Sequence, residues 1–131
     1  DPSLAQLASK CYEVIYLCCT SCRTPSELDG VLGAIHVAEP DFLERHLTAA
    51  LARLSSKGND TRQHGSELSA STNEAEESQY QRRILAWLLQ VAALSMHRAC
   101  MASPPRSHDV QRLVSMLLSH SSDHHRSGYV S

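Results

Sequence analysis

The chain has 131 residues, of which 42% are apolar and 20% are charged, and its formal net charge is −2. A chain of this length can bury the core of one domain, and this composition is that of a globular protein rather than a disordered one. The near-neutral charge excludes the large excess of basic residues that is typical of nucleic-acid-binding proteins, so we expect no nucleic-acid partner.

The composition also favours helices over strands. The chain holds one Phe and one Trp, so its core must be built from Leu, Ala, Val, Ile and Cys. Leu and Ala are strong helix formers, whereas strands are enriched in aromatic and β-branched residues. We therefore predict an all-α fold of about five helices in an antiparallel bundle, forming a single domain. A fragment of a helical-repeat array is the alternative, although no internal repeat is visible.

The first predicted helix covers about residues 3–22, with Asp1 as its N-cap and Pro2 at its first position. Apolar residues recur in it at three- and four-residue spacing, which indicates one helical face. We expect this face to point into the core; it consists of Leu4, Leu7, Cys11, Val14, Cys18 and Cys22.

Two further helices are predicted at 25–37 and 40–56. Thr24 and Glu27 form a capping-box pattern at the start of the first of them. Its two glycines, Gly30 and Gly33, either allow a close helix crossing or simply weaken the helix. The helix at 40–56 has a core stripe formed by Leu43, Leu47, Ala50, Leu51 and Leu54.

A long polar loop is predicted between the third and fourth helices, at 58–78. This segment is rich in Ser, Thr, Asn and Glu, so it buries too little apolar surface to offset the entropy of ordering, and we expect it to be mobile. It contains an N-glycosylation pattern at Asn59 and a weak phosphorylation pattern at Ser71, which precedes an acidic residue by three positions.

The helix predicted at 79–101 is apolar over most of its circumference, so we expect it to lie at the centre of the bundle. Its narrow polar stripe consists of Gln79, Arg83, Ala86, Gln90, Ala93 and His97. The longest apolar stretch, 84–96, is shorter than the roughly 20 residues of a membrane span, so we expect no membrane partner. A fifth helix is predicted at 108–120, followed by a frayed tail at 119–131.

Four of the five cysteines fall in the first predicted helix, where side chains point outward and rarely meet the geometry of a disulfide. We therefore expect a reducing, intracellular setting, most simply the cytoplasm. Cys19 and Cys22 form a C-x-x-C pair, and His97 with Cys100 would complete four zinc ligands if the first and fourth helices met in register. The alternative is that these cysteines are small core residues.

No motif for nucleophilic, phosphate-binding or paired-carboxylate catalysis occurs in the chain. We therefore expect no enzyme activity and no cofactor, and we predict a helical protein–protein interaction or scaffold module within a larger intracellular protein. Four residues beside the predicted core stripes are the candidate partner-binding residues: Tyr12, Tyr16, Phe42 and Met116. The alternatives are a zinc-stabilised or ligand-binding helical domain and, third, a secreted cytokine-like bundle.

Overall fold

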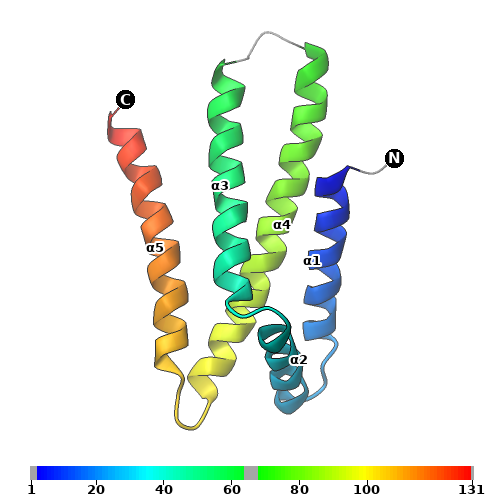
Figure 1. The fold of residues 1–131 in the computed structure, drawn as a ribbon, viewed down its shortest axis with the longest axis vertical. Helices are drawn as coiled ribbons and strands as arrows, with labels where there is room; N and C mark the ends of the chain where they lie inside the picture. Colours follow the sequence, from blue (N-terminus) through cyan, green and yellow to red (C-terminus); the bar gives the residue numbers. More distant parts are fainter. Residues whose placement is uncertain (1–2, 64–67, 131) are drawn as a thin grey trace.

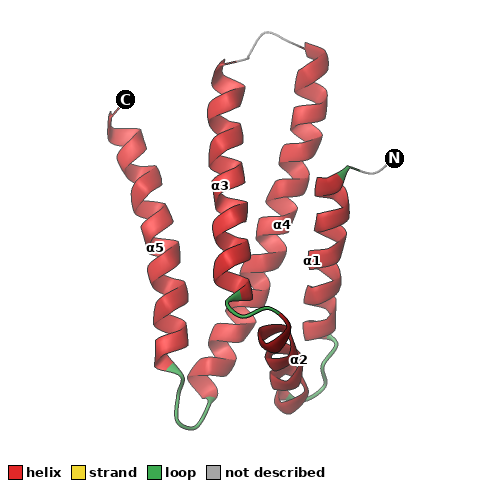
Figure 2. Ribbon diagram, in the orientation of Figure 1, coloured by secondary structure: helices red, strands yellow, loops and turns green. Residues whose placement is uncertain are grey.

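The computed structural model describes residues 3–63 and 68–130, and the side chains of residues 3–55 and 75–120. Every regular element in the described residues is a helix (Figure 2). The five helices are α1 (Leu4–Thr20), α2 (Pro25–Ala38), α3 (Phe42–Gln63), α4 (Leu68–Met101) and α5 (Ser107–Val130). Helices α1, α3, α4 and α5 run along the long axis of the molecule, and the short α2 lies at one end (Figure 1). The predicted all-α, five-helix fold is confirmed.

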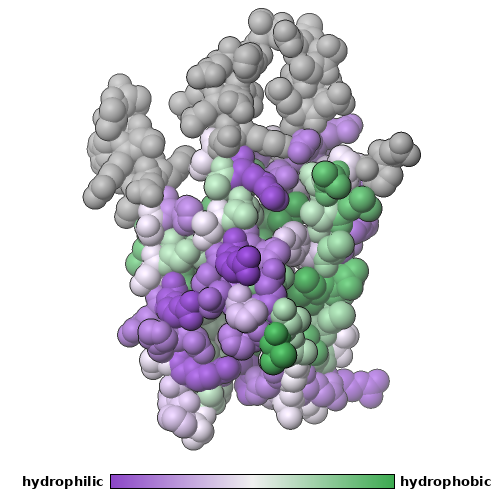
Figure 3. Space-filling view, in the orientation of Figure 1, coloured by the Kyte–Doolittle hydropathy of each residue, from purple (hydrophilic) through white to green (hydrophobic). Residues whose placement is uncertain are grey.

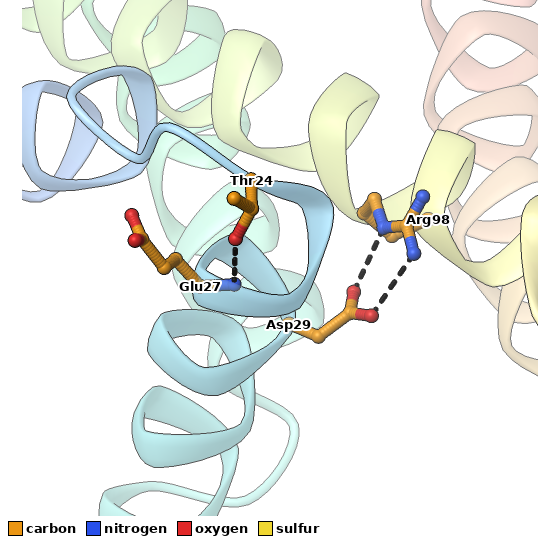
Figure 4. A network of polar contacts seen from close by, with 4 residues as sticks. All are labelled: Thr24, Glu27, Asp29 and Arg98. Carbon is orange, nitrogen blue, oxygen red and sulfur yellow. Dashed lines mark hydrogen bonds and ion pairs between the residues drawn. The ribbon is translucent and has the colours of Figure 1, made fainter.

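Side-chain caps fix where the first two helices begin. The cap of α1 is Ser3, whose Oγ accepts a hydrogen bond from the backbone N–H of Gln6 at 3.1 Å, and the expected cap Asp1 lies outside the described residues. The capping box of α2 is confirmed, because Thr24 Oγ1 accepts from the backbone N–H of Glu27 at 3.1 Å (Figure 4). The Glu27 carboxylate reaches back to the backbone N–H of Arg23 at 2.8 Å.

Three of the helices differ from their predicted bounds by more than two residues. Helix α3 begins at Phe42 instead of residue 40, because Asp41 has a left-handed backbone with φ of 60°. Its far end at Gln63 and the start of α4 at Leu68 carry helical backbone into the predicted polar loop from both sides. Helix α5 likewise continues to Val130. Extending a nucleated helix costs little even through Ser, Asn and Thr, which apolar periodicity does not register.

Parts of the predicted loop fall outside the description. Residues 64–67 are not described, and neither are the side chains of Asn59 and Ser71. The polar segment nevertheless sits where the sequence placed it, at the connection between α3 and α4 (Figure 1).

Helix α4 is the centre of the bundle, as predicted, because it contacts α1, α2, α3 and α5. The main core cluster joins three helices and consists of Leu47 and Ala50 from α3, Ile84, Leu88 and Ala92 from α4, and Leu113 from α5. All six residues of the predicted polar stripe on α4 are exposed. Since full burial of a Leu or Ile side chain contributes about 1.5–3 kcal/mol, this cluster accounts for much of the stability of the fold.

Helix α2 is the least embedded of the five, with no buried residue. A Cβ added at Gly30 or at Gly33 would meet no atom within 4 Å, so neither glycine marks a close helix crossing. The two glycines therefore weaken α2 without a packing benefit. Asp29 ties the helix to α4 by a two-pronged ion pair with Arg98, at 2.8 and 3.0 Å (Figure 4).

Helix α1 turns a different face inward from the one expected. Its buried residues are Ala5, Ser9 and Cys19, and Tyr12 and Tyr16 are half-buried on the same side. The predicted core face is mainly exposed, so that prediction was wrong. Small residues at Ala5 and Ser9 allow α1 to approach α4 closely, and the aromatic rings of both tyrosines find partners on the inner side.

Candidate functional site

An apolar stripe on α1 remains uncovered along the length of the helix. We call it the outer stripe, and its residues are Leu4, Leu7, Cys11, Val14 and Cys18. All five are exposed, with Leu4 at 85%, Leu7 at 49% and Val14 at 56%. Apolar side chains accordingly gather along the α1 side of the molecule, whereas the neighbouring surface over α3 and α5 is mostly hydrophilic (Figure 3). Contiguous apolar patches on soluble proteins commonly mark interaction sites.

The spacing within the outer stripe is that of a helix-packing seam. Its members are separated by three, four, three and four residues, which is the a/d pattern of a coiled coil. Helix α1 has 17 residues, so the stripe is about 25 Å long at most. Lys10 lies beside the stripe and forms an ion pair at 3.4 Å with Glu13, which lies farther around the helix. The outer stripe is thus an exposed apolar surface with the spacing of a helix-packing seam.

A chain of hydrogen bonds on the inner side of α1 joins three parts of the fold. The Tyr12 hydroxyl lies 2.5 Å from His46 Nδ1, and His46 Nε2 lies 2.6 Å from a carboxylate oxygen of Glu39. Burial raises the pKa of Tyr12, and the carboxylate of Glu39 raises it further against the opposing effect of Arg53. The phenol therefore keeps its proton and donates it to Nδ1, which leaves the other imidazole nitrogen to donate to Glu39.

This hydrogen-bond chain acts as a structural tie. Because the pKa of Tyr12 is raised, its phenol keeps its proton and acts as the hydrogen-bond donor to His46. These two hydrogen bonds connect α1 to α3 and α3 to Glu39, the residue that caps the end of α2. The Phe42 ring lies on the His46 ring with centroids 4.2 Å apart and shields it.

The four residues predicted to bind a partner do not form a common exposed surface. Tyr12 packs on Phe42 and His46, and Tyr16 packs on Trp87 with ring centroids 5.1 Å apart. Phe42 and Met116 lie against the main core cluster. The two tyrosines lie beside the predicted core stripe of α1, and because that stripe faces outward, the tyrosines face the bundle. All four side chains are half-buried and pack within the bundle, and their role in binding a partner stays a prediction.

The predicted zinc ligands also stay apart. Helices α1 and α4 do pack together, but Cys19 is buried while His97 and Cys100 are exposed. Among the described residues, no group of three or more His, Cys, Asp or Glu side chains is placed to hold a metal ion. Burial raises the pKa of Cys19, and the neighbouring thiols Cys22 and Cys18 raise it further. Cys19 therefore behaves as a small core residue, which was the alternative interpretation.

A cleft of about 400 Å³ opens between α2, α3, α4 and α5. Its walls are apolar at Leu32, Phe42, Val91 and Leu113, among others, and charged side chains line it as well. Two of its carboxylates are neutralised by ion pairs, Asp29 with Arg98 and Asp41 with Arg112 at 2.8 Å. The hydrogen bonds from Arg98 hold the pKa of Asp29 below its usual range. These pairs link α2 to α4 and the start of α3 to α5.

One stretch of α4 passes a simple test for a membrane span. Within the described residues, Ala75–Met101 is long and apolar enough, by length and composition, to cross a membrane. Counting uninterrupted apolar residues finds only the shorter stretch 84–96, because scattered polar residues divide the longer one. In the structure it is the core helix and packs against α1, α3 and α5.

Comparison with known protein families, curated protein sequences and solved structures finds no match to this chain. The candidate site is therefore defined by its own geometry. The three–four spacing of the outer stripe is explicit in the sequence, but the same spacing is also that of a core face. The sequence held no signal for the tie between Tyr12, His46 and Glu39, because Glu39 lies outside any helix.

Proposed function

We propose that this chain is a non-enzymatic protein–protein interaction module and that the outer stripe of α1 receives a helix of its partner. The observation that supports this most is an apolar seam of heptad spacing left uncovered on a folded bundle. Helix-in-groove and coiled-coil recognition both use anchors at this spacing. The module would then bind through α1, with α4 and the inner face of α1 as its rigid support.

A helix fits the outer stripe better than a lipid surface does. Helices that lie on membranes are rich in Lys and Arg on their polar face, which attract anionic headgroups. Lys10 is the one basic residue of α1, and its charge is balanced by Glu13 in an ion pair. A membrane would thus gain apolar contact from α1 but little electrostatic attraction.

Native cysteines provide the test. Cys11 and Cys18 belong to the outer stripe, whereas Cys100 is exposed on α4 and is not part of the stripe. In cells that express the protein, a partner on the stripe should slow alkylation of Cys11 and Cys18 relative to Cys100, as measured by mass spectrometry of the thiol adducts. In denaturant the three thiols should react alike.

A pair of variants assigns the protection to the stripe. Val14→Asp places a charge in the seam and should restore alkylation of Cys11 and Cys18 in cells. Val37→Asp is the matched control, because Val37 is 81% exposed on α2 and lies outside the seam. Alkylation of all three cysteines at the same rate in cells would contradict the proposed function.

A further inference from the structure

We propose that the cleft between α2, α3, α4 and α5 binds a small amphipathic amine, whose apolar body fills the cleft and whose ammonium group pairs with Glu44 and Asp109. This inference goes beyond the proposed function, because the described residues that line the cleft belong to these four helices and their connections, and none belongs to α1. The cleft volume of about 400 Å³ lies within the range of about 300–1,000 Å³ that is typical of small-molecule sites.

The cleft stays open because small residues line it where α2 approaches α4. These are Gly33 on α2, Ser95 on α4 and Ala102 just after α4. Helix α2 buries no side chain of its own and is tied to α4 by the ion pair of Asp29 with Arg98 (Figure 4). A Cβ added at Gly33 would meet no atom within 4 Å, so no other side chain of the described residues fills the space beside it.

The apolar part of the lining is suited to the body of such a ligand. Leu32, Phe42, Val91 and Leu113 come from four different helices and line one cleft. Val91 is 2% exposed and Leu113 is 4% exposed, so the packing of the bundle fixes both side chains before a ligand arrives. A ligand therefore orders few side chains when it enters, which lowers the entropic cost of binding.

The charges where α3 and α5 begin select a cation. Asp41 and Arg112 neutralise each other at 2.8 Å, and Glu44 and Asp109 line the same side of the cleft. Among the described side chains, neither Glu44 nor Asp109 forms a hydrogen bond or an ion pair. The hydrogen bond to Asp41 raises the pKa of Arg112, and the nearby charges of Glu44 and Asp109 raise it further. Three carboxylates therefore surround one guanidinium, which leaves negative charge available for an ammonium group.

The side of the cleft at Asp29 has the opposite surplus of charge, which sets the direction of the ligand. The hydrogen bonds from Arg98 lower the pKa of Asp29, and the nearby charge of Arg106 lowers it further. Two guanidinium groups thus act on one carboxylate there. An amine should therefore place its ammonium group on the side of α3 and α5 and away from Arg106.

Three probes that share one apolar body test the choice of charge. Phenylpropylammonium is added to the isotope-labelled chain up to about 10 mM, and backbone amide signals are followed by NMR. The signals of residues that line the cleft should shift, with a dissociation constant of about 1 mM or below for a ligand of this size. The neutral phenylpropanol should bind at least about fivefold more weakly, and the anionic phenylpropionate more weakly still.

A pair of glycine variants assigns the binding to the cleft. Gly33→Leu adds a side chain at the cleft wall and should weaken binding of phenylpropylammonium at least about tenfold. Gly30→Leu is the matched control, because Gly30 has the same open space on the same helix but does not line the cleft. Glu44→Gln and Asp109→Asn should each weaken binding about twofold to fivefold, as expected for exposed charge pairs. Circular dichroism checks that each variant keeps the helical fold.

Three outcomes would overturn this inference. Unchanged signals of the lining residues at about 10 mM amine would show that the cleft does not bind it. Phenylpropanol or phenylpropionate that binds as tightly as the amine would show that the carboxylates do not select an ammonium group. Undiminished binding to Gly33→Leu would place the amine outside the cleft.

Discussion

Both faces of α1 carry apolar residues, but one face is buried against the bundle and the other is exposed to solvent. The inner face carries Ala5, Ser9 and Cys19 against the bundle, and the outer face carries Leu4, Leu7 and Val14 toward solvent. Hydrophobicity alone would bury the larger leucines first. The inner face is buried because its small residues admit α4 closely and because its tyrosines pair with rings and with His46. The orientation of α1 therefore follows from how closely its inner face fits α4. The apolar face that stays exposed is the outer stripe, which is the candidate site.

The largest difference in the free energy of unfolding is expected between Leu→Ala in the buried core and Leu→Ala on the exposed outer stripe. Leu88 on α4 is 1% exposed within the core cluster, and Leu7 on the outer stripe is 49% exposed. Leu88→Ala should lower the free energy of unfolding by about 2–5 kcal/mol, because it leaves a cavity. Leu7→Ala should change it by less than about 0.5 kcal/mol in the monomer. Urea unfolding at low protein concentration measures both, and equal losses would show that the outer stripe is covered within the chain.

A smaller effect is expected from the tie on the inner face. Tyr12→Phe removes the hydrogen bond to His46 and should lower the free energy of unfolding by about 1 kcal/mol. Tyr16→Phe is the matched control, since its ring packs on Trp87 without a hydrogen bond from its hydroxyl in the described residues. Loss of stability in both variants alike would assign the effect to the loss of a hydroxyl in general.

The same tie has a pH signature. Because the pKa of Tyr12 is raised in the folded chain, the folded state holds the phenolic proton more tightly than the unfolded state does. This contribution is present below the unfolded pKa and is lost as the pH rises through the folded pKa. The native chain should therefore lose stability on the alkaline side more steeply than Tyr12→Phe, as urea unfolding across that range would show. The raised pKa of Cys19 acts in the same direction and remains in the variant.

The smallest effect is expected at the exposed ion pair that holds α2 beside the lower end of α1 and α4. Arg98→Gln should leave stability at neutral pH close to that of the native chain, because solvent screens such pairs. The pKa of Asp29 is lowered in the folded chain, so its contribution is present above the unfolded pKa and lost as the pH falls through the folded pKa. Acid unfolding followed by circular dichroism should be slightly shallower in Arg98→Gln, and a large change at neutral pH would give α2 a role in holding α1.

The sequence predicted the elements whose pattern allows one interpretation. On α4, four polar residues and two alanines recur along one narrow line, and each of these six residues is exposed. The capping box at Thr24 and Glu27 formed as expected, since it depends on residues three positions apart. Both features depend only on residues close together in the sequence, so they can be predicted without knowing which helices pack nearby.

The errors arose where the outcome depends on other segments. Helix α1 is apolar on both sides, so periodicity cannot say which side meets α4. The choice is made by the closeness of approach at Ala5 and Ser9, and by partners such as His46 that lie more than thirty residues away. The candidate site was missed for the same reason, because an exposed seam and a core face have identical spacing. The zinc prediction required a register between α1 and α4 that helix spacing does not contain.

The contact between Tyr16 and Trp87 gives the molecule an optical reporter. Trp87 is the only tryptophan of the chain, and its ring rests against α1 on the inner side. Its emission should shift when α1 leaves α4, whereas a helix that arrives on the outer stripe meets no tryptophan of this chain. Intrinsic fluorescence will thus report the separation of α1 from the bundle and not the docking of a helix on the outer stripe, so a change in it can be assigned to unfolding.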